Sequence, residues 1–101
     1  METMKKLEAY RDSYGIDVFS EYGEFVNTTL RRIVFENGRC AHIIDHENNH
    51  RFSNRFSVAT CDHEGHFDWE ILNGYTGAKD GCIPCDTEDE VIAACEFIRN
   101  L

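Results

Sequence analysis

The dipeptide Asn37-Gly38 constrains the fold of this chain most, because it lies between two segments rich in strand-forming residues. Residues 25–36 before it contain several Thr, Val, Ile and Phe side chains, and residues 39–45 after it have the character of a second strand. Asn-Gly is a strong hairpin signal, since a two-residue type I′ turn needs positive φ at both central positions. The sequence therefore predicts an antiparallel hairpin around this turn.

Two later segments, residues 51–61 and 66–72, alternate between apolar and polar side chains. The apolar side chains that share one face of each segment are Phe52, Phe56, Val58, Phe67, Trp69 and Ile71. A period of two indicates antiparallel strands with one buried and one solvated face. Together with the hairpin, these segments predict a four-stranded antiparallel meander.

Both ends of the chain have the pattern of an amphipathic helix. Apolar side chains recur every three or four positions over residues 3–14, and Gly15 suits the left-handed position that ends a helix. Near the other end, Thr87 and Glu90 match a capping box. We therefore predict one compact α+β domain over residues 1–101, with the meander packed on N- and C-terminal helices. Its predicted core contains Leu7, Tyr10, Ile33, Phe56, Val58, Phe67, Trp69, Ile71, Val91, Cys95 and Ile98.

Negative charge is concentrated in the last two-fifths of the chain. Residues 61–101 contain 10 acidic and 2 basic side chains, so −8 of the total net charge of −9 lies there. Such a field favours a basic protein partner and disfavours direct binding of nucleic acid, which requires a basic stripe. The candidate partner-binding residues are Asp62, Glu64, Asp68, Glu70, Asp86, Glu88, Asp89 and Glu90. The competing interpretation is a solvated acidic surface that serves solubility.

A second candidate surface is basic and lies in the middle of the chain. Its residues, which we expect on one side of the sheet, are Arg31, Arg32, Arg51 and Arg55.

The sequence contains no phosphate-binding loop, dinucleotide fingerprint or nucleophile with an evident base. We therefore expect a protein that is not an enzyme.

The chain has five cysteines, an odd number, and no signal peptide is evident. This pattern predicts free thiols in a reducing compartment and hence a cytoplasmic protein. A run of about 18 apolar residues, which a transmembrane helix needs, is absent from the sequence. We therefore expect no membrane association, and the sequence does not define the oligomeric state.

Several cysteines and histidines have spacings that suit a structural zinc ion. Zinc prefers four Cys or His ligands in a tetrahedron, supplied by pairs two or three residues apart. The candidate ligands are Cys61, His63, His66, Cys82 and Cys85. A site of this kind would make the chain a zinc-stapled structural or adaptor domain, with no other cofactor expected. The competing interpretation is that the histidines are exposed and the cysteines pack as small apolar side chains.

Two further interpretations concern the same residue types. Cys82 and Cys85 form a C-x-x-C pair, but the acidic residues that follow raise a thiol pKa and oppose redox chemistry. His42, His46 and His50 recur every four residues. On a strand, the first two would be about 13–14 Å apart, too far for one metal ion. We therefore expect these histidines to be solvated.

The β-rich residues 25–72 and the acidic, capped segment 86–98 together resemble small phage-encoded inhibitors of the anti-CRISPR type. The resemblance is to a type of protein and involves no shared motif, so it transfers no functional residues. It implies a non-catalytic inhibitor whose acidic surface blocks a basic, nucleic-acid-binding groove on a partner protein. For a phage-encoded protein, the implied location is the cytoplasm of the host cell.

Overall fold

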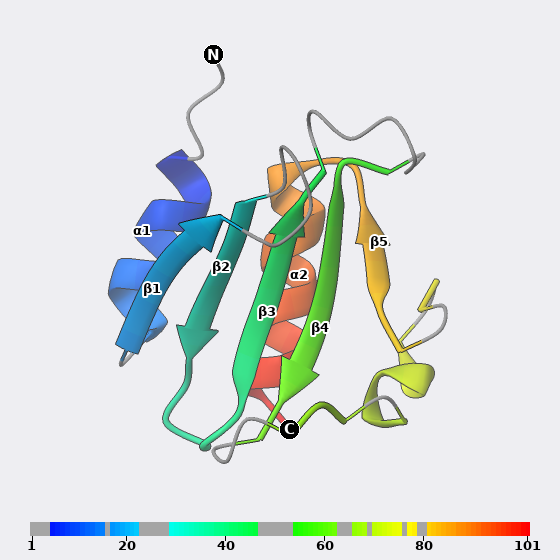
Figure 1. The fold of residues 1–101 in the computed structure, drawn as a ribbon. Helices are drawn as coiled ribbons and strands as arrows, with labels where there is room; N and C mark the ends of the chain where they lie inside the picture. The colour runs from blue at the N-terminus through cyan, green and yellow to red at the C-terminus, as the bar shows by residue number, and fades with distance from the viewer. Residues whose placement is uncertain are drawn as a thin grey trace.

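Two helices cover one face of an antiparallel sheet in the computed structural model of this protein (Figure 1). The structure describes residues 5–15, 17–22, 29–46, 54–62, 66–68, 70–75, 77–78 and 81–101. For residues 17–22, 29–31 and 73 it describes the backbone only. The elements are α1 (Lys5–Tyr14), β1 (Asp17–Tyr22), β2 (Thr29–Val34), β3 (Cys40–Asp45), β4 (Phe56–Cys61), the 3₁₀ helix η1 (Ile71–Gly74), β5 (Ile83–Cys85) and α2 (Glu88–Arg99). The described strands form one sheet in chain order, β1-β2-β3-β4-β5. The predicted α+β class, with an antiparallel meander on N- and C-terminal helices, is confirmed.

The β2–β3 hairpin forms around Asn37-Gly38, although its loop is one residue longer than predicted. Phe35 N–H donates to Arg39 C=O at 2.9 Å, which closes a three-residue loop, and Gly38 N–H donates to Phe35 C=O at 3.0 Å. Gly38 has φ +84°, a left-handed conformation that glycine adopts without steric cost. The asparagine has a different role, because its side-chain amide donates to C=O groups at the end of α2. Asn37 thereby joins the hairpin to the last turn of that helix.

The predicted strand over residues 66–72 is wrong. Only an isolated bridge between Cys61 and Phe67 continues the sheet there. Asp68 Oδ1 then accepts a hydrogen bond from Ile71 N–H at 3.1 Å, and this turn leads into η1. The position beside β4 is taken by β5 instead, with Val58 opposite Ile83.

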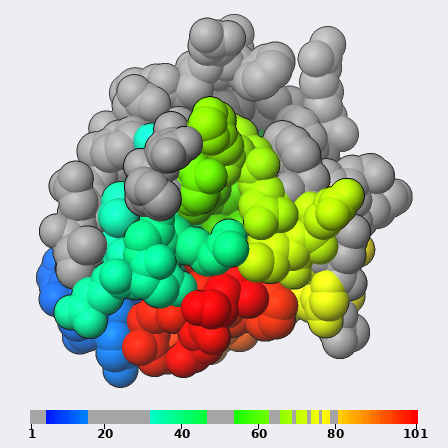
Figure 2. All heavy atoms as spheres, turned by 90° about the horizontal axis from the view of Figure 1, so that it is seen from below, coloured from blue at the N-terminus to red at the C-terminus, as the bar shows by residue number. Residues whose placement is uncertain are grey.

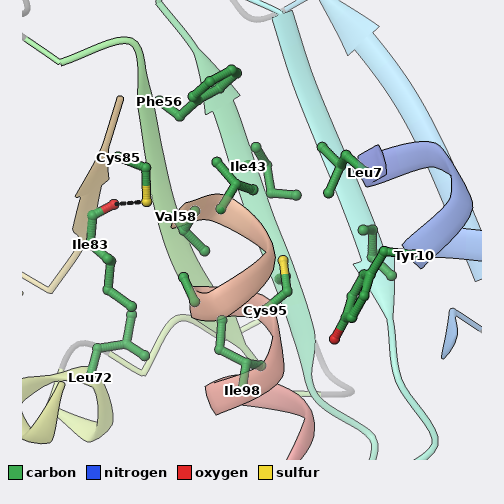
Figure 3. Packing of buried hydrophobic residues seen from close by; sticks show 14 of the residues in the cluster. Leu7, Tyr10, Ile43, Phe56, Val58, Leu72, Ile83, Cys85, Cys95 and Ile98 are labelled. Carbon is green, nitrogen blue, oxygen red and sulfur yellow. Dashed lines mark hydrogen bonds between the residues drawn. The ribbon is translucent and has the colours of Figure 1, made fainter. Parts of the chain in front are cut away.

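The apolar core lies between the sheet and α2 (Figure 3). Alternate residues of the central strands point toward the helices, and α2 contributes side chains that are fully buried. The predicted core residues that are confirmed are Leu7, Tyr10, Ile33, Phe56, Val58, Val91, Cys95 and Ile98. Phe67 is 39 % exposed because its bridge to Cys61 places it on the sheet face away from the helices, where its ring centre lies 5.0 Å from that of His42. Ile71 is half-buried against the core. The prediction for Trp69 lies outside the described residues.

The sheet face away from the helices is also buried where β3 and β4 pair. The expected alternation of one buried and one solvated face therefore does not hold there. His42 and His46 are 8 % and 6 % exposed. The expectation that they are solvated is therefore wrong, whereas His50 lies outside the described residues. Neighbouring side chains on β4 replace water around them, since Ala59 is directly opposite His42 and Ser57 Oγ lies 2.9 Å from His46 Nε2.

A disulfide joins Cys40, at the start of β3, to Cys61, at the end of β4. These residues are directly opposite each other in the strand register, and their Cα atoms are 5.4 Å apart, which suits a disulfide. The expectation that all five cysteines are free thiols is therefore wrong for this pair. Cys82, Cys85 and Cys95 remain in the thiol form.

Candidate acidic interface

The acidic residues of the candidate interface lie in two groups at opposite ends of the molecule (Figure 1). The lower acidic group, Asp62, Asp68 and Glu70, follows the end of β4 at the bottom of this view. The upper acidic group, Asp86, Glu88, Asp89 and Glu90, surrounds the beginning of α2 at the top. Glu64 lies outside the described residues. The structure therefore does not bring the predicted set together into one surface.

Two carboxylates of the upper acidic group hold α1 in place. Glu88 Oε2 accepts a hydrogen bond from Leu7 N–H at 2.9 Å. This N–H is one of the first-turn groups that have no partner within their own helix. The Asp89 carboxylate lies 3.3 Å from Lys6 Nζ, in an exposed ion pair of small energetic value. Part of the acidic sequence thus serves to pack the two helices together.

Asp86 and Glu90 complete the upper acidic group. Glu90 belongs to the predicted capping box: its backbone N–H donates to Thr87 Oγ1 at 3.2 Å, and its Oε1 accepts from the same hydroxyl. Asp86 is exposed and makes no hydrogen bond or ion pair among the described residues. Both side chains are exposed to solvent, and the Glu90 carboxylate is also held by the Thr87 hydroxyl.

Loss of the cap that Glu88 provides is expected to destabilise the protein. We predict that Glu88→Ala lowers the free energy of unfolding by about 1 kcal/mol, as for other lost helix N-terminal acceptors. Urea denaturation followed by circular dichroism measures this change. Asp86→Ala is the matched control, because Asp86 also lies at the beginning of α2 but caps no other element. Equal stabilities of the two variants would contradict a capping role for Glu88.

The lower acidic group is weaker as a binding surface. Asp62 Oδ1 accepts a hydrogen bond from His66 N–H at 3.0 Å. Asp68 caps the turn into η1 and lies 3.5 Å from Arg39. Glu70 is exposed and has no hydrogen bond or ion pair among the described residues. Most of this negative charge is therefore engaged within the lower end of the molecule.

The candidate zinc ligands are not brought together. Cys61 is bonded to Cys40 and lies on the face of the sheet away from the helices. Cys85 is opposite Phe56 and lies in the core on the helix-covered face. His66 is exposed, Cys82 is half-buried, and His63 lies outside the described residues. Within the described part of the chain, no group of three or more His, Cys, Asp or Glu side chains is arranged to hold a metal ion.

The environment of Cys85 opposes thiol redox chemistry. Burial, followed by the charges of Glu90 and Asp86, raises the pKa of the Cys85 thiol to about 12. Its Sγ donates to Ile83 C=O at 3.6 Å within β5. The thiolate is the reactive form of cysteine. Cys85 is therefore a protonated packing residue at neutral pH.

Two arginines of the candidate basic surface, Arg32 and Arg55, have side chains that the structure describes. Arg32 lies beside the buried His42, with its terminal nitrogen 3.5 Å from Nδ1 of the histidine. Arg55 lies 4.9 Å from the centre of the Phe56 ring, and its Nε is 3.7 Å from Asp45 Oδ1. Arg51 and the side chain of Arg31 lie outside the described part of the structure. Arg32 and Arg55 are therefore engaged with their own sheet.

Sequence reasoning missed a polar pocket where α1 and α2 end. It has a volume of about 310 Å³ and is lined by Ser13, Tyr14, Glu36, Asn37 and Arg99. Figure 2 shows the face on which the end of α1 (blue), the β2–β3 turn (blue-green) and the end of α2 (red) meet. These segments are far apart in the sequence, and their polar residues have no common motif. We refer to this site as the helix-end pocket.

Comparison with protein-family models, with curated proteins and with solved structures finds no match for this chain. In the described part of the chain, no helix combines the length and the apolar character needed to cross a membrane.

Proposed function

We propose that this protein is a non-catalytic inhibitor that binds another protein through its upper acidic group. The expected partner carries a basic groove that binds nucleic acid, and the acidic residues occupy that groove in place of phosphates. This is the mode of action implied by the resemblance to anti-CRISPR inhibitors.

The observation that supports this proposal is the exposure of Asp86, Asp89 and Glu90 at one end of the molecule. Three carboxylates lie within five residues, and the short strand β5 and the capped helix α2 hold them on a defined scaffold. Preorganised negative charge accelerates encounter with a basic partner and makes the complex sensitive to salt. The lower acidic group is less suited, because Asp62 and Asp68 accept backbone N–H groups and Asp68 also forms a partly buried ion pair with Arg39, whereas the Asp89–Lys6 pair is exposed.

The proposal is tested by affinity capture from a bacterial lysate at low salt, followed by identification of the retained proteins. A partner of the expected kind is a nucleic-acid-binding protein that is released by salt and displaced by duplex DNA. Because thiols are kept reduced in the cytoplasm, capture is carried out with and without reductant.

Charge reversal at each end of the molecule shows which acidic group makes the contact. We predict that Asp86→Lys weakens binding of the captured partner at least tenfold, because the lysine repels the basic groove. Glu70→Lys is the matched control, since Glu70 is also exposed and has no described ion pair. It is expected to change the affinity less than threefold. Calorimetry with the purified partner measures both, and equal affinity of Asp86→Lys and the unmodified protein would reject the proposal.

A further inference from the structure

We infer that the helix-end pocket binds a cationic side chain, arginine or lysine, from a protein partner. This inference rests on the proposed function, because it assigns the basic partner a second point of contact. The pocket lies at the end of the molecule opposite the upper acidic group (Figures 1 and 2). The two sites can therefore be tested independently.

The charge of the helix-end pocket favours a cation. Glu36 is exposed at the rim, in the β2–β3 turn, and its carboxylate makes no hydrogen bond or ion pair among the described residues. Tyr14 and Arg99 are the last residues of α1 and α2, so both helices end at this pocket. The C-terminal end of a helix carries a partial negative charge from its aligned peptide dipoles, and at α2 the Asn37 amide offsets part of it by donating to the C=O groups of Ile98 and Arg99. Glu36 and two helix ends therefore act in the same direction.

Among the described residues that line the pocket, the one cationic side chain is already neutralised. Arg99 Nε donates to Glu96 Oε2 at 2.5 Å, and a second guanidinium nitrogen donates to Oε1 at 3.2 Å. The same guanidinium lies 4.3 Å from the centre of the Tyr14 ring. The hydrogen bond from Arg99 is the largest cause of a lowered pKa of the Glu96 carboxyl, and a hydrogen bond from Tyr10 acts in the same direction. Arg99 and Glu96 thus form a fixed pair, and the charge of Glu36 remains for an incoming group.

The walls of the pocket are polar and fixed in position. Asn37 Nδ2 donates to Ile98 C=O and to Arg99 C=O, both at 3.0 Å, while its Oδ1 accepts from Arg39 N–H at 3.0 Å. The Ser13 hydroxyl supplies a further acceptor. A volume of about 310 Å³ is at the lower end of the range for small-ligand sites. The pocket therefore suits one side chain with a terminal charge better than a large cofactor.

The test uses the peptide acetyl-Gly-Arg-Gly-amide, which carries one positive charge and no other. The peptide is titrated into ¹⁵N-labelled full-length protein at low salt, and amide shifts are followed by NMR. We expect saturable shifts at Ser13, Tyr14, Glu36 and Asn37, with a millimolar dissociation constant. The same peptide with citrulline in place of arginine keeps the shape of the side chain but is neutral, with a urea oxygen in place of one donating NH2 group. It is expected to cause no saturable shift.

The variant Glu36→Gln keeps the size of the side chain and removes its charge. It is expected to weaken binding of the arginine peptide about fivefold, at the upper end of the range for a solvent-exposed ion pair. Glu70→Gln is the control for the same loss of charge outside the pocket, and it is expected to leave the affinity unchanged. Equal binding of the citrulline peptide, or an unchanged affinity of Glu36→Gln, would overturn the inference. Saturable shifts around Asp86 without shifts at the pocket would also overturn it, while leaving the proposed function standing.

Discussion

Reduction of the Cys40–Cys61 disulfide is expected to lower the free energy of unfolding by about 3 kcal/mol. The bond closes a loop with a sequence separation of 21 residues, and closing a loop of this length restricts the unfolded chain by about that amount. Both cysteines are almost completely buried, at 3 % and 1 % exposure. The change is large compared with the total stability of a small domain.

Alkylation and denaturation together test this prediction. Without reductant, the unfolded protein should react at the three cysteines that are in the thiol form, and after reduction at all five. Reductant should lower the denaturation midpoint of the unmodified protein. It should have no effect on Cys40→Ala/Cys61→Ala, the matched control without the bond. Five reactive thiols before reduction would show that the bond does not form.

The Cys40–Cys61 disulfide could not be predicted from local sequence patterns. The number of cysteines and the absence of an evident signal peptide predicted free thiols, and the 21-residue spacing of Cys40 and Cys61 matches no motif. Only the β3–β4 register places the two side chains opposite each other. Register is set by the hydrophobic pattern and the turn geometry of the paired strands, so the spacing of the two cysteines alone does not reveal it. Because disulfides persist in oxidising surroundings, the bond also removes the main reason for predicting a reducing compartment.

Local signals predicted the hairpin and the final helix well. Asn37-Gly38 marked the turn, and Thr87 with Glu90 marked the beginning of α2. These features depend on residues that are near each other in the sequence. Residues 66–72 show the opposite case, because their alternation is typical of a strand, yet an Asp68 turn and the competing strand β5 exclude them from the sheet. Tertiary competition of this kind overrides β propensity.

For the candidate sites too, the sequence predicted what depends on neighbouring residues and missed what depends on tertiary packing. The sequence identified the acidic residues but not their separation into two groups, which depends on the opposite directions of β4 and β5. It assigned Glu88 to partner binding, whereas its carboxylate caps α1, 81 residues away in the sequence. No sequence pattern indicated the helix-end pocket, because Ser13, Glu36 and Arg99 become neighbours only when α1, the β2–β3 turn and α2 pack together.

Acidification is expected to destabilise the protein by about 3 kcal/mol through His42 alone, between pH 7.5 and pH 4. Burial on β3, followed by the charge of Arg32, lowers the pKa of His42 from 6.5 to about 4. Below pH 6.5 the unfolded chain binds a proton at this residue while the folded protein does not. The stability present at neutral pH is therefore lost progressively as the pH falls toward 4. A difference of 2.5 pKa units corresponds to about 3 kcal/mol.

The replacement His42→Gln isolates this contribution. Glutamine cannot titrate, and its side-chain oxygen can accept the contact that Arg32 makes with Nδ1 of the histidine at 3.5 Å. Guanidinium denaturation at several pH values should show that the variant loses about 3 kcal/mol less than the unmodified protein on acidification. The remaining loss includes His46, whose pKa is lowered chiefly by burial, so its effect has the same sign. NMR titration of the His42 ring in the folded protein measures its pKa directly, and a midpoint near 6.5 would contradict the burial of this ring on β3.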